Sequence, residues 1–428
     1  MAVPAGARLV RDFVRASLYD RAQGYFTRRG SAVVGALPRP LQFGGFTGEA
    51  GYRAALRQAY DELGTSWLTP SEIFRPHYAN ALADTFARSH EARHQHPPSG
   101  AEGAHAASLD IYEVGGGSGG VARDILLRLR ARHPAAFRSV RYRAIEISPQ
   151  LAWRQEKTVA EGGADLSARF ESLVGDAACP EVWGGTDARE CHIFGLEVLD
   201  NLPHDLVRRR ADGTWEEALV APAADGGGKW EEVWRPLSDH LASRCLESYD
   251  WDGAAPASSP VDRVLRLVLE GTLGPAADRR VFLPTGCLRL LDTLCQVRPA
   301  HRLLLADFDF LPDTVIAGRN APLVSDTSDG QACDFNSFLL PYGTADIFFP
   351  TDFGALSALH AAAARREGLP KEAASPRAVL RSRDFLRCAS PDSARATATR
   401  SGYNPLLEDF SNTNFFTAGY ESAPWAKP

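Results

Sequence analysis

The sequence has no long apolar run and no pair of cysteines in CxxC spacing. No run approaches the roughly 20 apolar residues that a helix needs to cross a bilayer, so we expect no membrane span. The seven cysteines are scattered and odd in number, which favours reduced thiols in a reducing compartment and argues against structural zinc. We therefore predict no metal site. A formal net charge of −6 gives no overall attraction to nucleic acid, and we expect no nucleic-acid partner.

The pattern along the 428 residues changes from helical to alternating. Residues 8–90 carry mostly helical spacing, whereas from residue 108 strands alternate with helices, which predicts a parallel sheet covered on both faces. Ser148-Pro149 predicts the start of the helix after the second strand. A predicted strand meander, with turns at Asp212-Gly213 and at the glycines of 226–228, interrupts this rhythm after residue 205, and a helix is predicted at 260–273. We predict an N-terminal helical region (1–92), a linker (93–107), an α/β domain (108–365) with an insertion at about 205–280, and a C-terminal extension (366–428).

The first 29 residues are rich in arginine and poor in acid. This composition is typical of a mitochondrial transit peptide. It also fits a basic amphipathic first helix of the fold, with Val10, Phe13, Val14 and Leu18 on one face. The sequence leaves both interpretations open.

The stretch IYEVGGGSGG, residues 111–120, places five glycines in six positions between a predicted strand and a predicted helix. In open α/β sheets, ligands bind beyond the carboxyl ends of the strands. Glycines there let a ligand approach the main chain, and the helix N-terminus offers free N–H groups. The stretch therefore predicts a nucleotide or nucleoside site, and a tight turn without ligand is the alternative.

Two ligand classes fit these glycines. Gly115, Gly117 and Gly120 match G-x-G-x-x-G of dinucleotide sites, whereas Gly115, Gly117 and Gly119 match E-x-G-x-G-x-G of S-adenosylmethionine (SAM) enzymes. The acid of the second pattern is Glu113, which would attract the cationic amino acid moiety of SAM and repel a pyrophosphate. This favours SAM over a nicotinamide cofactor.

Further acids follow the next predicted strands. Glu146 ends the second strand, where a carboxylate can accept both ribose hydroxyls, and Asp176 follows the third, where it could bind an adenine amino group. Glu197 and Asp200 follow the fourth strand. Carboxylates beside a methyl donor can hold a guanidinium or accept a proton. For Asp200 and Asn201 the alternative is a helix cap.

Segments throughout the chain resemble one known family. They are SLYDRAQGYF, SWLTPSEIFRPHYANALA, YEVGGGSG, AIEISPQLAWRQ, GLEVLDNLPHD, RLLLADF and DIFFPTDFGALSAL. In this order they are similar to motifs of the MidA-type SAM-dependent methyltransferases, the family of the mitochondrial arginine methyltransferase needed for respiratory complex I assembly. The chain looks closest to a mitochondrial branch found in fungi and protists.

The resemblance implies a class I SAM-methyltransferase (Rossmann-like) doubly wound sheet and SAM as the cofactor. The cofactor-binding residues would be Glu113, Gly115, Gly117, Gly119, Glu146 and Asp176. The catalytic residues would be Glu197, Asp200 and Glu72, acting on an arginine of a protein partner in the mitochondrial matrix. A homodimer is left open.

The sequence also departs from the family pattern. Leu196 replaces the asparagine before the fourth-strand acid, and Val198 and Leu199 replace two aromatic residues after it. These changes touch the substrate side more than the cofactor side. They keep open a second function, that of an inactive methyltransferase-like scaffold in the assembly of a mitochondrial complex.

Overall fold

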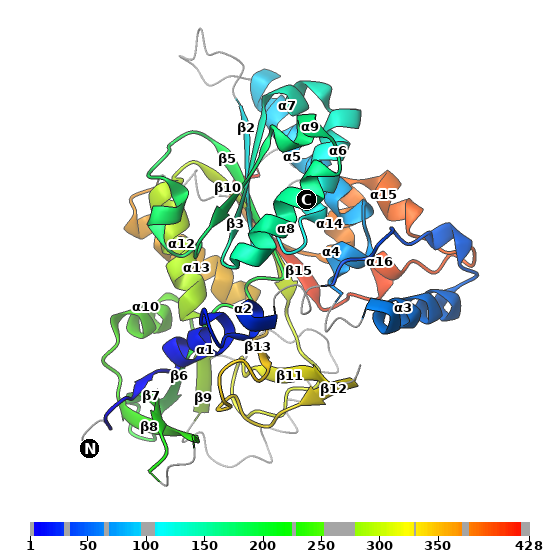
Figure 1. The fold of residues 1–428 in the computed structure, drawn as a ribbon. Helices are drawn as coiled ribbons and strands as arrows, with labels where there is room; N and C mark the ends of the chain where they lie inside the picture. Colours follow the sequence, from blue (N-terminus) through cyan, green and yellow to red (C-terminus); the bar gives the residue numbers. More distant parts are fainter. Residues whose placement is uncertain are drawn as a thin grey trace. The chain divides into compact units, whose positions relative to one another are not determined.

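The computed structural model describes residues 4–29, 35–63, 68–95, 108–224, 228–251, 279–328, 331–369 and 376–420 (Figure 1). The chain divides into two compact units, each assembled from three segments. The glycine-loop unit contains residues 29–198, 293–306 and 367–428, and the meander unit contains residues 1–28, 199–292 and 307–366. Within the described ranges, every helix is too short or too polar to span a bilayer.

The glycine-loop unit is built on a seven-stranded mixed sheet. In sheet order its strands are β14 (Arg377–Arg381), β15 (Thr413–Ala418), β10 (His301–Phe308), β5 (Cys191–Leu196), β2 (Leu109–Val114), β3 (Val140–Glu146) and β4 (Phe170–Val174). The five strands from β10 to β4 run parallel, which confirms the predicted α/β class and its predicted strands. All six residues of β2 are buried, as expected for a strand covered on both faces.

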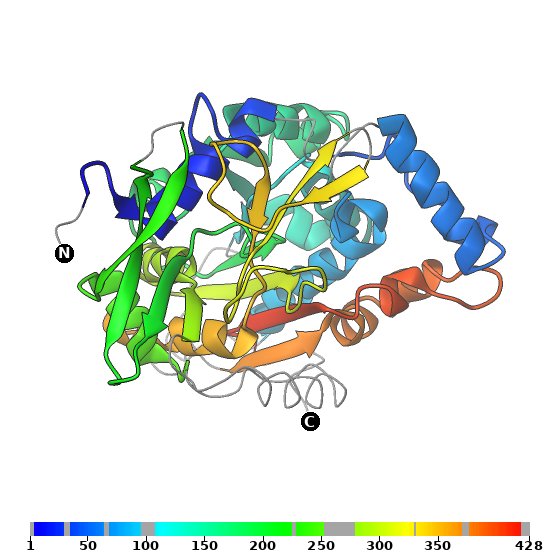
Figure 2. The same ribbon diagram turned by 90° about the horizontal axis from the view of Figure 1, so that it is seen from below.

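The C-terminal segment contributes two strands to this same sheet. β14 and β15 pair antiparallel, with Arg377 opposite Ala418, and β15 is the neighbour of β10 (Figure 2). Both strands lie in the predicted C-terminal extension, residues 366–428. They complete one side of the central sheet.

Ten helices of the described chain belong to this unit. They are α3 (Glu49–Leu63), α4 (Pro70–Ile73), α5 (His77–Gln95), α6 (Gly120–Arg132), α7 (Pro134–Ser139), α8 (Pro149–Ala160), α9 (Ala164–Ser167), α14 (Ser382–Ala389), α15 (Pro391–Ala396) and α16 (Pro405–Glu408). The predicted start of α8 is confirmed, because the Ser148 side chain accepts a hydrogen bond from the Leu151 N–H at 3.4 Å and Pro149 occupies the first turn.

The main hydrophobic core of the unit joins α5, α6 and the sheet. Phe86 of α5, Leu126 of α6, Ile111 of β2 and Phe194 of β5 are all fully buried members of this cluster. Each such side chain contributes about 2 kcal/mol when it leaves water. Packing in this core therefore fixes the strand and the helix that flank the glycine stretch.

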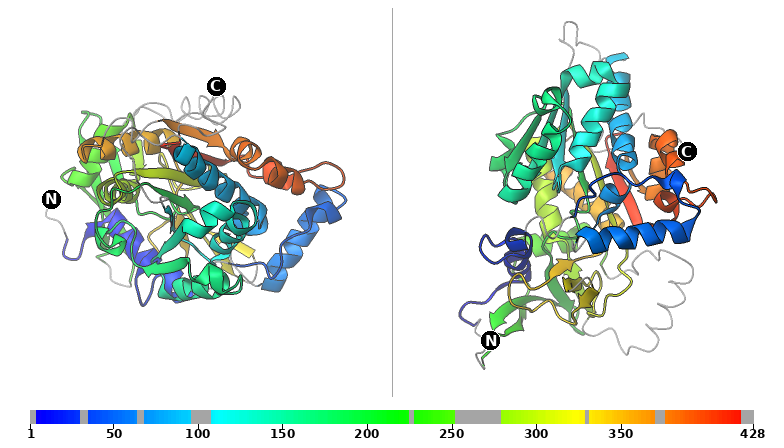
Figure 3. Two further views of the ribbon diagram at one scale, coloured as in Figure 1. Left: turned by 90° about the horizontal axis from the view of Figure 1, so that it is seen from above. Right: turned by 45° about the vertical axis from the view of Figure 1, so that its right-hand side comes forward.

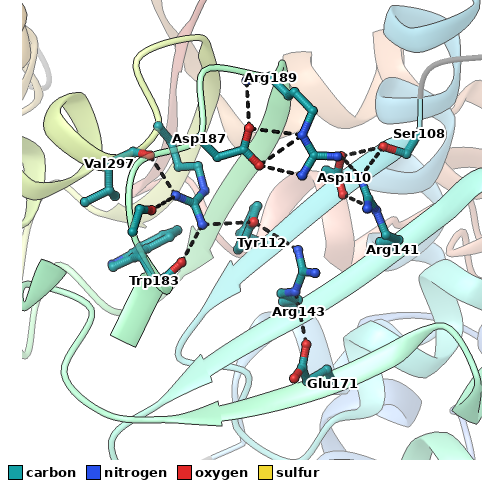
Figure 4. A network of polar contacts seen from close by, with 12 residues as sticks. Ser108, Asp110, Tyr112, Arg141, Arg143, Glu171, Trp183, Asp187, Arg189 and Val297 are labelled. Atoms are coloured by element: carbon teal, nitrogen blue, oxygen red, sulfur yellow. Dashed lines mark hydrogen bonds and ion pairs between the residues drawn. The ribbon is translucent and has the colours of Figure 1, made fainter. Parts of the chain in front are cut away.

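A polar network holds the beginning of β2 (Figure 4). The buried Arg298 guanidinium lies 5.0 Å from the centre of the Tyr112 ring and donates a hydrogen bond to the Trp183 carbonyl at 2.6 Å. Two residues earlier, the Asp110 carboxylate accepts hydrogen bonds from Arg141 of β3 at 2.7 and 2.8 Å. The strand that leads to the glycines is thus anchored at its start by charged groups and at its centre by packing.

Helix α3 is attached to the C-terminal helices (Figure 3). The Arg400 N–H donates to the Phe46 carbonyl at 3.0 Å, and the Tyr52 and Tyr403 rings lie 6.4 Å apart. The C-terminal segment therefore binds both the sheet and the N-terminal helices of its unit.

The meander unit contains two smaller sheets. One has the order β1-β7-β6-β9 with β8 paired to β7, and the other has the order β12-β11-β13. The strands are β1 (Arg8–Leu9), β6 (Asp205–Arg209), β7 (Trp215–Pro222), β8 (Trp230–Pro236), β9 (Arg279–Leu283), β11 (Leu323–Ser328), β12 (Gln331–Asp334) and β13 (Asp346–Phe348). The helices are α1 (Val10–Tyr19), α2 (Tyr25–Arg29), α10 (His240–Ser248), α12 (Thr285–Val297, whose last residues belong to the other unit) and α13 (Phe353–Arg366).

Several predictions for this unit can be compared with the structure. The meander is confirmed by β6, β7 and β8, and its first turn is confirmed by Gly213, which has a φ of +85°. The first helix is also confirmed, because Val10, Phe13, Val14 and Leu18 of α1 are buried. The predicted turn at 226–228 falls partly outside the described residues, and the helix predicted at 260–273 falls wholly outside them.

Candidate functional site

The glycine stretch forms a loop between the end of β2 and the start of α6. Gly115, Gly117 and Gly119 have φ angles of +71°, +51° and +79°, which side chains disfavour. Gly115 still donates its N–H to the Ile145 carbonyl at 3.0 Å, so the loop leaves the sheet only after this residue. Gly115 and Gly117 are partly exposed, and the main chain is accessible at these two positions.

The strand register brings the predicted acids to one edge of the sheet. Val114 lies opposite Ile145, so Glu113 lies two residues earlier along the sheet than Glu146, a depth of about 7 Å. Asp176 follows the end of β4, and Glu197 follows the end of β5. Glu113, Glu146, Asp176 and Glu197 therefore come from the carboxyl ends of four adjacent strands, as a ligand laid across the sheet edge requires.

Glu113 lies beneath the loop. Its side chain is 3% exposed and accepts a hydrogen bond from the Tyr142 hydroxyl at 2.7 Å. Its Oε2 is 3.2 Å from the point that a Cβ on Gly116 would occupy. Burial raises the pKa of Glu113 to about 7, the charge of Glu146 adds to this effect, and the Tyr142 bond opposes it.

Glu146 is held from two sides. Its Oε1 accepts the Ser148 N–H at 3.0 Å, and its Oε2 accepts a hydrogen bond from the Gln155 amide at 3.0 Å. Burial raises the pKa of Glu146 to about 7, although these hydrogen bonds favour the ionised form. The carboxylate thus faces the loop in a fixed orientation with neutral partners.

Gln155 is the site residue that sequence reasoning missed. Its amide nitrogen also donates to the Gly117 carbonyl at 3.3 Å, and its amide oxygen accepts from the Ser172 hydroxyl at 2.9 Å. One side chain therefore connects the glycine loop, Glu146 and β4. The available signal was a polar residue within the buried stripe of α8.

Glu72 lies behind the loop rather than at an open surface. Its carboxylate accepts hydrogen bonds from the Leu37 N–H at 2.8 Å, Arg75 at 2.9 Å and the Ser118 hydroxyl at 3.3 Å. Arg75 in turn binds Asp124 of α6 at 2.8 Å, and all three charged side chains are buried. These contacts favour a supporting role for Glu72, in place of the substrate contact that the resemblance implied.

Asp176 forms a turn at the end of β4. Its Oδ1 accepts the Ala178 N–H at 2.9 Å, and the residue is half-buried. The turn fixes the carboxylate close to its own backbone. Asp176 is therefore ordered at the sheet edge where adenine binding was predicted.

Glu197 has a strained backbone. Its φ is +53°, one of two positive values among the described non-glycine residues, and its N–H donates to the Ala306 carbonyl at 2.8 Å. The Tyr60 hydroxyl is near enough for the charge of Glu197 to add to the burial that raises the pKa of Tyr60. Strain of this kind costs about 1–3 kcal/mol and is often found where a side chain is aimed at a ligand.

The strain at Glu197 leads to a stability prediction. We expect Glu197→Gly to be more stable than Glu197→Ala by about 1 kcal/mol, because glycine adopts this φ without strain. Urea unfolding of both variants measures the difference. The same two substitutions at Glu171, which lies in β4, should give the opposite order, and the same order at both sites would contradict the assignment of strain.

Asp200 belongs to the meander unit. Its N–H and that of Leu199 donate to Asp307 Oδ2 at 3.2 and 2.8 Å, and its carbonyl accepts the Phe349 N–H at 2.8 Å. Residues 199–202 form a turn, so the interpretation of Asp200 as a helix cap is wrong. The Asp307 carboxylate therefore holds the backbone of this turn.

Comparison with known proteins identifies the family. The family model described as "Putative S-adenosyl-L-methionine-dependent methyltransferase" matches residues 92–369, more than half of the chain. The chain belongs to this methyltransferase family. The match covers the glycine loop and the four acids at the adjacent strand ends, and SAM is the cofactor of the family.

Solved structures agree with the methyltransferase fold. A protein from Burkholderia thailandensis, crystallised with S-adenosyl-homocysteine, has 18% sequence identity and a TM-score of 0.63, over 99% of this chain and 91% of that chain. A second, native structure from the same organism has 16% identity and a TM-score of 0.60, over 98% and 90% of the two chains. No curated protein matches the sequence.

The residues present fit SAM. The accessible main chain at Gly115 and Gly117 can lie against a nucleoside, whereas a Cβ on Gly116 would press on Gln155 at 3.0 Å. Glu113 and Glu146 supply negative charge beneath the loop, which suits a ligand with a positive sulfonium and ammonium. The same charge opposes the diphosphate of a nicotinamide dinucleotide.

Proposed function

We propose that this methyltransferase transfers the methyl group of SAM to an arginine nitrogen of a protein partner, in the mitochondrial matrix and in the assembly of a respiratory or other complex. Family membership supports the methyltransferase activity, and the MidA-type motifs support the arginine substrate. The observation that carries the proposal is the accessible glycine loop above two buried carboxylates, with Glu197 on the adjacent strand end. We also propose the doubly wound, Rossmann-like arrangement of class I enzymes for this unit.

The residues of the chain would act mainly by orientation. SAM, when bound, supplies an electrophilic methyl group. Glu113 and Glu146 would hold the cationic and ribose parts of the cofactor, and Asp176 the adenine. Glu197 would bind the guanidinium of the substrate and leave one nitrogen aligned with the methyl group. Most of the rate would then come from positioning and electrostatic stabilisation.

Methyl transfer from labelled SAM into mitochondrial extract tests this function. We expect the wild-type protein to label a protein band, and Glu197→Gln to reduce the rate at least 100-fold while SAM affinity, measured by calorimetry, stays within about threefold. Glu171→Gln, an exposed acid on β4, is the matched control and should retain the rate. Equal labelling by Glu197→Gln and wild type would exclude Glu197 from the reaction.

A scaffold without catalysis is the second candidate. Val198, one of the departures from the family pattern, packs against the loop, with its Cγ1 only 2.5 Å from the point that a Cβ on Gly115 would occupy. SAM binding without transfer to any protein, peptide or free arginine would favour this alternative. Binding of neither SAM nor S-adenosyl-homocysteine would argue against both functions.

A further inference from the structure

We propose that Glu113 and Glu146 share a proton in the cofactor-free protein and release it when a sulfonium binds. The pair would thereby distinguish SAM from its product by charge. This inference rests on the proposed use of SAM. It adds a specificity-determining role for two residues that otherwise only contact the cofactor.

The two carboxylates are close enough for the charge of Glu146 to help raise the pKa of Glu113. They lie on adjacent parallel strands and on the same face of the sheet, because Glu113 is level with Ala144 and side chains alternate along β3. Both are at least 95% buried. Glu113 Oε2 lies 3.2 Å from the point that a Cβ on Gly116 would occupy, and Glu146 is linked to the loop through Gln155 and the Gly117 carbonyl.

In the part of the chain that the structure describes, the groups that hydrogen-bond to the pair are neutral. From β3 the facing groups are Tyr142, a neutral donor, and the Ser148 N–H that follows the strand. From α8 the facing group is the neutral Gln155 amide.

One arginine lies behind the same loop. Arg75, next to Gly120, already binds two carboxylates, Glu72 of α4 and Asp124 of α6. This group of three carries one net negative charge when both acids are ionised. It therefore cannot neutralise Glu113 and Glu146.

The protonation of the pair determines the direction in which SAM affinity changes with pH. With pKa values of about 7 for both acids, the pair carries roughly one negative charge at neutral pH. A cation at the loop favours the doubly ionised pair, so its binding lowers these pKa values and sends a proton to solvent. SAM affinity should therefore rise as the pH rises through about 7. S-adenosyl-homocysteine has a neutral thioether, and its affinity should change less.

Calorimetric titration tests this linkage without any turnover. SAM and S-adenosyl-homocysteine would be titrated into the full-length protein between pH 6 and pH 8, in two buffers with different ionisation enthalpies. We expect SAM to release up to one proton. We expect the ratio of SAM affinity to product affinity to rise about tenfold across this range. All titrations are made at one ionic strength, set with inorganic salt, so that the screening of charges is the same at every pH.

Two variants and a control identify the group responsible. Glu113→Gln should abolish most of the pH dependence. Tyr142→Phe should keep it but move its midpoint to higher pH, because the hydrogen bond that favours the ionised carboxylate is lost. Glu171→Gln, on the neighbouring strand but exposed, should behave as wild type.

The outcomes separate this inference from the proposed function. SAM binding with a pH-independent affinity ratio would overturn the shared proton and leave the methyltransferase function standing. An unchanged pH dependence in Glu113→Gln would also overturn it. SAM binding that fails at every pH would overturn both proposals.

Discussion

Replacing Gly119 with alanine should abolish cofactor binding and destabilise the glycine-loop unit by about 3 kcal/mol. A Cβ at this position would lie 2.6 Å from the Gln155 Cα and 3.1 Å from its carbonyl oxygen. These are backbone atoms of α8, so the clash cannot be relieved by a side-chain rotation. Relief requires a shift of α8, which carries Gln155 and through it the orientation of Glu146.

Gly184 provides the matched control for Gly119. Its φ is +69°, close to the +79° of Gly119, but a Cβ there would meet nothing within 4 Å. Gly184→Ala should therefore cost only the backbone strain, about 1 kcal/mol, and leave SAM affinity unchanged. Urea unfolding and calorimetry on both variants measure the two effects. If Gly119→Ala and Gly184→Ala lost the same free energy of unfolding, backbone strain alone would explain the cost at Gly119, and the clash with α8 would not.

The second large effect is expected at Arg75. Arg75→Met should destabilise the protein by about 3–5 kcal/mol, because it leaves the buried carboxylates of Glu72 and Asp124 without their cation. Glu72 also accepts a hydrogen bond from the Ser118 hydroxyl of the glycine loop. Because Arg75→Met removes the cation that holds Glu72, the loop should become less ordered and SAM affinity should fall. Urea unfolding gives the first quantity and calorimetry the second.

An exposed ion pair supplies the comparison for Arg75. Arg130 binds Asp165 at 3.0 Å, with both side chains at least 40% exposed, and Arg130→Met should cost less than about 1 kcal/mol. Adding Glu72→Gln to Arg75→Met should restore part of the stability, since it removes one uncompensated charge. If Arg75→Met destabilised the protein no more than Arg130→Met, the buried ion pairs of Arg75 with Glu72 and Asp124 would contribute no more to stability than an exposed pair.

The parts of the fold that were predictable are those with strong local patterns. The apolar run of β2, the glycines after it and the Ser148-Pro149 start of α8 each specify structure within a few residues, and all three are confirmed. The acids at the strand ends could be placed for the same reason. A strand end is set locally, and parallel pairing then brings successive ends to one edge.

Partners that lie far apart in the sequence could not be predicted in this way. Arg8 of β1 pairs with Val220 of β7, and β15 lies beside β10, because tertiary packing selects these neighbours. The sequence pattern shows that a strand will be buried, but it does not show which strands or helices will pack against it. The same limit applies to Glu72, whose partners Leu37 and Ser118 come from separate segments.

The place of β15 beside β10 has a consequence for how the protein is made. β10 is complete at residue 308, but its neighbour begins only at residue 413. At ordinary translation speeds the ribosome takes roughly 5 to 20 seconds to add the intervening stretch of about 100 residues. During this time one side of β10 presents unpaired peptide groups, a surface prone to association with other nascent chains. Production of this protein in cells should therefore depend on chaperones that shield the growing polypeptide until its end is released.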